Sequence, residues 1–170
     1  APITLTDVSI TGGGVNSSSG ALTLTRVRIL NAPNTGANTS SAPITLVDST
    51  VSGAGNNGVN ASTGTITLTR SSIAGSFGFG VNAGAGAVTL VDSSVTGSGN
   101  DGIDSGGGAV SLTRSLVSGN GTDEGGSGID AHGSAVTLVN STLSGNFGRG
   151  IDGNGTANLD AVTITGNTNG

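Results

Sequence analysis

The chain has 170 residues, a length that suits one domain, and it carries a formal net charge of −5. It contains no Cys, which excludes a disulfide framework and a thiolate site, and the negative charge argues against nucleic acid as a partner. No apolar run of about 18 residues is present, so we expect no membrane insertion within this segment. The 33 Gly would suit a disordered chain, but the regular placement of Leu, Ile and Val argues against disorder.

A short segment that alternates apolar and polar residues recurs along the chain and predicts the first strand of each repeat. Copies lie at 3–5, 22–24, 44–46, 66–68, 88–90, 110–112 and 136–138, and a degenerate copy ends at Leu159. The last residue of every copy is Leu, and successive Leu are separated by 19, 22, 22, 22, 22, 26 and 21 residues. Alternation with a period of two is typical of a strand that is buried on one face.

Two further elements follow each of these segments and complete a repeat. An apolar residue stands five positions after each Leu, as at Val51 and Ile73, and a Gly usually follows two residues later. A third element reads Gly, a small or β-branched apolar residue, and then Asn or Asp, with copies at 14–16, 36–38, 58–60, 80–82, 102–104, 128–130 and 150–152. The pattern therefore predicts three short strands per repeat, separated by turns rich in Gly, Ser and Asn.

No single repeat of this kind can bury its own apolar side chains. Stacking successive repeats at about 4.8 Å would place equivalent residues above one another and pair every strand with its neighbours. We therefore predict one all-β domain over residues 1–170, a β-solenoid of about eight coils of about 22 residues each. The pattern is already under way at Ala1 and stops part way round a coil at Gly170, so we expect a piece of a longer rod or a subunit that stacks end to end.

The repeats resemble those of the single-stranded right-handed parallel β-helix superfamily, along the whole chain. The segments 89–97 (TLVDSSVTG) and 138–146 (LVNSTLSGN) look like the repeats of bacterial surface adhesins, autotransporter passengers and polymorphic outer-membrane proteins. The resemblance implies a secreted or cell-surface protein that acts as a structural or adhesive rod. The same superfamily includes pectate lyases and polygalacturonases, so fold alone does not choose between a rod and an enzyme.

Charged residues two positions after each Leu alternate in sign over six coils. They are Asp7, Arg26, Asp48, Arg70, Asp92 and Arg114, and Asn140 follows. Opposite charges that stack one coil apart attract, so we expect a ladder of surface ion pairs at one corner, with a binding face as the alternative.

A second polar column ends the third strand of each coil. It begins with Asn16, Asn38, Asn60 and Asn82, which predict a ladder of amide hydrogen bonds, and it continues with Asp104, Asp130 and Asp152. Stacked carboxylates repel one another and need an offset, for which Ca²⁺ is one candidate. Asp104, Asp130 and Asp152 are thus hypothetical calcium ligands, with Asp101, Asp123 and Glu124 on neighbouring turns. A purely structural role for these Asp is the simpler alternative.

Two other functions compete with the rod as interpretations of the sequence. A polygalacturonase-like enzyme fragment could use Asp101, Asp104, His132 and Arg149, but the chain has no loops that would wall a cleft, and no Trp or Tyr platform. An ice-binding protein could use the Thr column that contains Thr45 and Thr89, which we expect to face outward. We interpret Phe77 and Phe147, which occupy equivalent places three coils apart, as local cover for the core.

The sequence as a whole favours a non-catalytic rod that is extracellular or on a cell surface. The expected partners are further copies of the chain, stacked end to end, or surface glycans. No cofactor is predicted apart from the hypothetical Ca²⁺.

Overall fold

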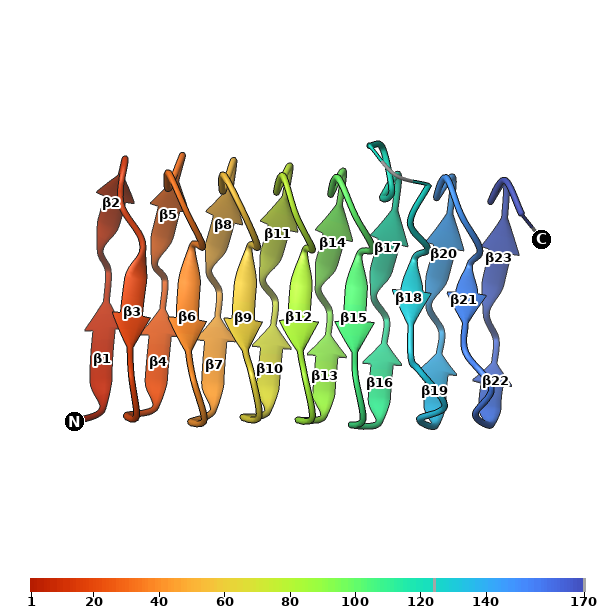
Figure 1. Ribbon diagram of the computed structural model, residues 1–170, viewed down its shortest axis with the longest axis horizontal. Coiled ribbons are helices and arrows are strands. Elements are labelled where there is room, and N and C mark those ends of the chain that lie inside the picture. Colours follow the sequence, from red (N-terminus) through yellow and green to blue (C-terminus); the bar gives the residue numbers. More distant parts are fainter. Residues whose placement is uncertain (124, 170) are drawn as a thin grey trace.

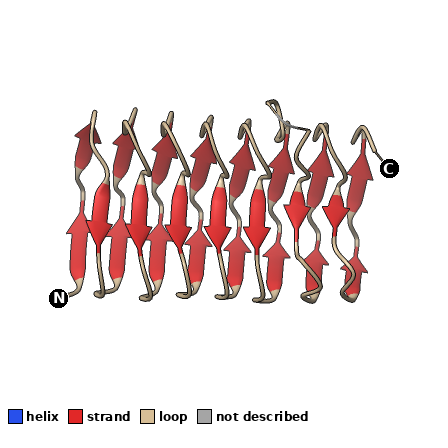
Figure 2. Ribbon diagram, viewed as in Figure 1, coloured by secondary structure: helices blue, strands red, loops and turns tan. Residues whose placement is uncertain are grey.

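The chain forms three long parallel sheets that run side by side along a rod. The computed structural model describes residues 1–123 and 125–169, and these residues form strands and turns without any helix (Figure 2). Each coil contributes one short strand to each sheet, and the coils follow one another from the N-terminal to the C-terminal end of the rod (Figure 1). The structure thus has seven complete coils and an eighth that contributes strands to two of the sheets.

The three sheets are assembled in coil order. Sheet A contains β1 (Ile3–Thr6), β4 (Leu22–Thr25), β7 (Ile44–Val47), β10 (Ile66–Thr69), β13 (Val88–Val91), β16 (Val110–Thr113), β19 (Val136–Val139) and β22 (Ala157–Asp160). Sheet B contains β2 (Ser9–Thr11), β5 (Arg28–Leu30), β8 (Thr50–Ser52), β11 (Ser72–Ala74), β14 (Ser94–Thr96), β17 (Leu116–Ser118), β20 (Thr142–Ser144) and β23 (Thr163–Thr165). Sheet C contains β3 (Val15–Ser17), β6 (Ala37–Thr39), β9 (Val59–Ala61), β12 (Val81–Ala83), β15 (Ile103–Ser105), β18 (Ile129–Asp130) and β21 (Ile151–Asp152).

Equivalent residues stack in register in all three sheets, as the repeat predicts. In sheet A, Leu68 pairs with Leu46 on one side and Leu90 on the other. The pairing of Leu112 with Leu138 survives the longer step of 26 residues, because the extra residues lie in the turn between β17 and β18. Indels are therefore confined to turns, and the core columns remain continuous.

The core is a narrow stack of aliphatic side chains enclosed by the three sheets. Strands of sheet A alternate buried and half-buried residues, so that Ile66 and Leu68 point inward while Thr67 and Thr69 point outward. Central strands of sheet B supply one inward residue each, such as Ile73, and the three-residue strands of sheet C supply two each, such as Val59 and Ala61. Each coil buries only a few side chains, so the stability of the rod depends on contacts between neighbouring coils.

The corner between sheets A and B contains two residues, and the first of them has a left-handed backbone in all eight coils. Its φ lies between 46° and 57° at Asp7, Arg26, Asp48, Arg70, Asp92, Arg114, Asn140 and Ala161. Asp and Asn tolerate this conformation better than other residues that carry a side chain, whereas Arg rarely adopts it. The tertiary structure must therefore impose the conformation on the Arg residues.

Candidate functional site

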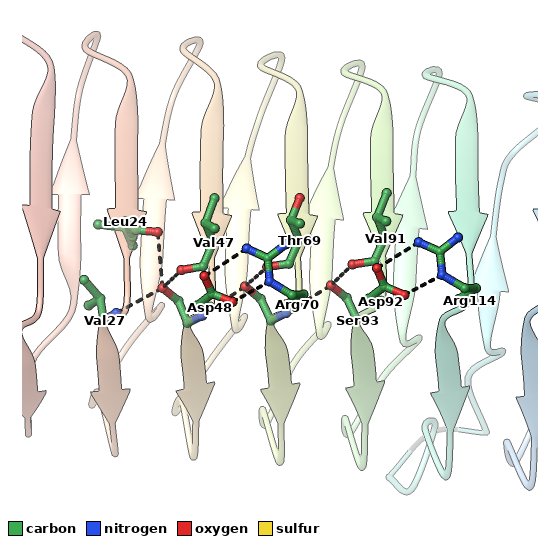
Figure 3. Close-up of polar contacts among 12 residues, drawn as sticks. Leu24, Val27, Val47, Asp48, Thr69, Arg70, Val91, Asp92, Ser93 and Arg114 are labelled. Atoms are coloured by element: carbon green, nitrogen blue, oxygen red, sulfur yellow. Dashed lines mark hydrogen bonds and ion pairs between the residues drawn. The ribbon is translucent and has the colours of Figure 1, made fainter.

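Three bidentate ion pairs line the corner between sheets A and B. Each Arg reaches back to the Asp of the preceding coil through Nε and Nη2, as Figure 3 shows for Arg70 and Arg114. The Nε–Oδ1 and Nη2–Oδ2 distances are 2.6 and 2.9 Å for Arg26–Asp7, 2.6 and 2.9 Å for Arg70–Asp48, and 2.6 and 2.8 Å for Arg114–Asp92. The alternating column is therefore a series of separate two-coil pairs, and the predicted ion-pair ladder is confirmed in this form.

The ion pairs fix the charge states of their members. Hydrogen bonds from the Arg guanidinium groups hold the pKa of Asp7, Asp48 and Asp92 below the usual Asp range. The same contacts raise the pKa of the three Arg partners. All six side chains are exposed to solvent, so water and salt screen the attraction and the pairs contribute little stability.

A ladder of buried Ser residues runs directly beneath the ion pairs. Its members are the second corner residue in five successive coils, at Ser49, Ser71, Ser93, Ser115 and Ser141. Each Oγ accepts a hydrogen bond from the backbone N–H of the preceding coil and donates one to the carbonyl two residues earlier in its own coil. The sequence analysis missed this ladder, although Ser three positions after Leu in five coils was a visible signal.

The ion pairs and the strands of sheet B enclose a shallow, open groove of about 730 Å³, which we call the corner groove. It extends over five coils and is lined by Asp48, Ser49, Thr50, Arg70, Ser71, Ser72, Asp92, Ser93, Ser94, Arg114, Ser115, Leu116, Asn140 and Thr142. Most of these side chains are hydroxyl or charged groups. Leu116 is the large apolar exception and leaves 37% of its surface exposed.

The Asn column of sheet C has the predicted register but fewer hydrogen bonds than expected. Asn38 pairs with Asn60 along the sheet, and Asn60 Nδ2 donates to Asn38 Oδ1 over 2.7 Å. Within the described residues, Asn16 and Asn82 make no such side-chain bond to their Asn neighbours. The prediction of a continuous amide ladder is therefore wrong in this respect: in the described residues the Asn column has one amide–amide bond between neighbouring coils.

The three Asp of the same column have side-chain partners within the protein itself. Asp104 and Asp130 stack in register, and His132 Nε2 lies 2.9 Å from Asp104 Oδ1 and 3.3 Å from Asp130 Oδ2. Arg149 Nη1 donates to Asp152 Oδ1 over 2.7 Å.

In the part of the chain that the structure describes, no three His, Cys, Asp or Glu side chains converge as a metal site would require. The arrangement of Asp104, Asp130 and Asp152 thus gives the calcium hypothesis no geometric support, and Glu124 lies outside the described residues.

Burial changes the pKa of one carboxyl group in this column and of another beside it. It raises the pKa of Asp101, although the Ser127 N–H donates to the carboxylate and partly opposes the effect. Burial also raises the pKa of Asp104, against the opposing attraction of His132. Both shifts disfavour the charged form of an acid that has no guanidinium partner, in contrast to the corner between sheets A and B.

A second internal ladder, also missed by the sequence analysis, lies at the turn that follows sheet B. Asn120, Asn146 and Asn167 stack there, with Asn120 Nδ2 donating to Asn146 Oδ1 and Asn146 Nδ2 donating to Asn167 Oδ1. In earlier coils the equivalent positions hold Ser76 and Ser98, whose buried hydroxyls have no partner within the described residues. Polar side chains inside this corner therefore cross-link only the C-terminal coils.

The two equivalent Phe residues are exposed, so their predicted role as cover for the core is wrong. Phe77 leaves 74% of its surface exposed and Phe147 leaves 51%. Each follows a buried residue, Ser76 or Asn146, at the turn after sheet B, and the next side chain along the turn consequently points outward. The core at this turn is closed by those smaller polar residues.

Comparison of the sequence with known protein families gives a match over most of its length. No helix long and apolar enough to cross a membrane is present in the described residues. No match was found among curated proteins or among solved structures. A family model described as a right-handed β-helix region matches residues 10–169, nearly the whole chain, and agrees with the stacked parallel sheets. The chain therefore belongs to the right-handed β-helix family.

Proposed function

We propose that this β-helix is a non-catalytic, extracellular rod that acts as a structural or adhesive element. The observation that carries the proposal is a surface pattern that repeats along five or more coils. The ion pairs, the hydroxyl groups and the corner groove all follow this repeat. Catalysis requires a nucleophile, acid or base to converge on one reacting atom. Adhesion and scaffolding benefit instead from a surface that offers the same contact many times.

The charged groups that could serve an enzyme are already engaged with one another. Arg149 pairs with Asp152, and His132 is shared by Asp104 and Asp130. A polygalacturonase-like reaction would need these groups to act on a substrate at a cleft. A second hollow of about 210 Å³ lies near β21 and β22. Of the charged residues named in this paragraph, Asp152 is the one that lines it.

The outer coils suggest how the rod is extended. Leu159 and Ile164 in the last coil are exposed, and Ile3 and Leu5 in the first coil are only partly buried. Sheet edges of this kind pair readily with further strands. Coils of a second copy would cover them, and we include end-to-end stacking in the proposal.

Two assays test the proposed function. Beads coated with the chain should adhere to immobilised cell-surface polysaccharide, whereas beads coated with an unrelated acidic protein should not. In parallel, acidic and neutral polysaccharides should remain uncleaved by the chain. Cleavage that disappears when Asp104, Asp130 and Asp152 are all replaced with Asn would refute the proposal in favour of an enzyme, and beads that fail to adhere would refute the adhesive role.

Ice binding stands as the second candidate because sheet A presents two outward columns in register. Thr45, Thr67 and Thr89 stack along one column, and Thr or Val fills the other. Thermal hysteresis that is present in the wild type and lost in Thr45→Lys and Thr89→Lys would favour this function over adhesion.

A further inference from the structure

We propose that the corner groove is a binding site for an uncharged, extended polysaccharide. This inference rests on the adhesive function proposed above, for which it names the surface and the class of ligand. The groove crosses five coils, so it spans about 19 Å at the strand spacing of about 4.8 Å. It is open along its length and shallow, a shape that accepts a linear polymer and does not enclose a small molecule.

The charges in the groove favour an uncharged ligand. Its lining contains two Asp and two Arg, which sum to zero, and each Arg is already paired with an Asp. A polyanion would meet Asp48 and Asp92 at every second coil, and a polycation would meet Arg70 and Arg114. Neither kind of polymer gains a net attraction from this surface.

The hydrogen-bonding groups that remain free suit hydroxyls. Arg70 uses Nε and Nη2 for Asp48, so its Nη1 has no protein partner among the described residues. The carboxylate oxygens of Asp48 retain further lone pairs after the Arg bonds. One edge of the groove thus alternates donors and acceptors along the rod. A hydroxyl both donates and accepts, so a polyhydroxylated chain can satisfy both kinds of group in turn.

The rest of the groove offers hydroxyl groups and one apolar side chain that can contact sugar rings. Each Ser hydroxyl beneath the ion pairs donates one hydrogen bond and accepts one within the protein, so these groups are already engaged there. Thr50, Ser72 and Ser94 offer outward hydroxyls on sheet B, and Leu116 offers one exposed apolar side chain to the C–H face of a ring. An extended peptide fits less well, because the groove crosses the strands and presents no open sheet edge with which a peptide backbone could pair.

Titration of the whole chain with defined oligosaccharides tests the inference. The probes are the neutral cellohexaose, xylohexaose, mannohexaose and maltohexaose, with hexagalacturonate and an acidic decapeptide for comparison. At least one neutral hexasaccharide should bind the wild type, and its Kd should change less than about twofold between about 0.05 and about 0.5 M NaCl, because no net charge is involved.

Variants locate the site. Ser94→Trp fills the middle of the groove and should raise the Kd of the bound hexasaccharide by at least about tenfold. Asn82→Trp, which places the same bulk on the outward face of sheet C, is the matched control and should bind as the wild type does. Arg70→Asn removes a donor, keeps a residue that tolerates the left-handed corner, and should weaken binding several-fold even if Ser94→Trp folds poorly.

The inference is overturned if no neutral hexasaccharide binds the wild type, if Ser94→Trp and Arg70→Asn both bind as the wild type does, or if hexagalacturonate or the peptide binds best with strong salt dependence. The bead assay separates this failure from failure of the proposed function. Beads that adhere equally well with wild type and Ser94→Trp leave the adhesive rod standing and place its contact outside the groove. Wild-type beads that do not adhere contradict the adhesive role itself.

Discussion

Ser93 stands in the middle of the buried Ser ladder, and its replacement with Ala tests how strongly that ladder holds neighbouring coils together. Its Oγ accepts a hydrogen bond from the Ser71 N–H over 3.1 Å and donates one to the Val91 carbonyl over 2.8 Å. The carbonyl also accepts a bond from the Arg70 N–H, so it keeps a partner in the variant. The Ser71 N–H would have none, because in the described residues it donates to Ser93 Oγ and to no other acceptor.

The cost of Ser93→Ala follows from that single unpaired group. A buried N–H without a partner costs about 1–3 kcal/mol, and Ser71 is 4% exposed, so the free energy of unfolding should fall by about 2 kcal/mol. For a chain of this size, such a loss lowers the Tm by about 4–8 °C. Ser94→Ala is the matched control, since Ser94 is half-buried and bonds only to the Ser72 hydroxyl, and it should change stability by less than about 0.5 kcal/mol.

Urea unfolding and amide hydrogen exchange measure the two consequences separately. Urea unfolding gives the loss of stability, and exchange at the Ser71 amide should become faster in Ser93→Ala than in the wild type. The reasoning would be refuted if Ser93→Ala were as stable as Ser94→Ala, or if exchange at Ser71 were unchanged. Either outcome would mean that water replaces the lost hydroxyl without cost.

Three further changes probe the core, the corner and the acidic column. Leu90→Ala, at a fully buried site, should lower the free energy of unfolding by about 3–4 kcal/mol in urea titrations, and a loss below about 1 kcal/mol would contradict a close-packed core. Arg70→Asn should change the urea midpoint much less than Ser93→Ala does, because the pair that it breaks is exposed; a comparable loss would show that the pairs hold the coils together. Asp101→Asn should raise the Tm near neutral pH. The pKa of Asp101 is higher in the folded chain than in the unfolded chain, so the acid favours folding below its unfolded pKa and this benefit disappears as the pH rises through the folded pKa. Thermal melts at about pH 3 and about pH 7 should therefore show the gain only at the higher pH, and an equal gain at both would rule out this cause.

The sequence by itself determined the solenoid, the number of coils and the register. Leu at near-constant spacing, with alternating neighbours, leaves no way to bury the apolar residues except by stacking equivalent strands, so Leu46, Leu68 and Leu90 had to form one column. The alternation of Asp and Arg at the corner was readable in the same way, because register follows from the core. The insertion before β18 did not change the predicted register, because a turn can lengthen without moving the strands that it joins.

Only the tertiary structure decided which polar groups meet. Each Arg at the corner between sheets A and B reaches the Asp of the preceding coil and not that of the following coil, although both lie one coil away in the column. The same corner turns Ser93 inward, where its hydroxyl bonds to the coil before, and the turn after sheet B directs Phe77 outward. Spacing along the chain fixes which residues share a column, but the direction of a side chain depends on the backbone torsions at each corner. The ladders, the exposed aromatic residues and the corner groove therefore become visible only once the coils are stacked.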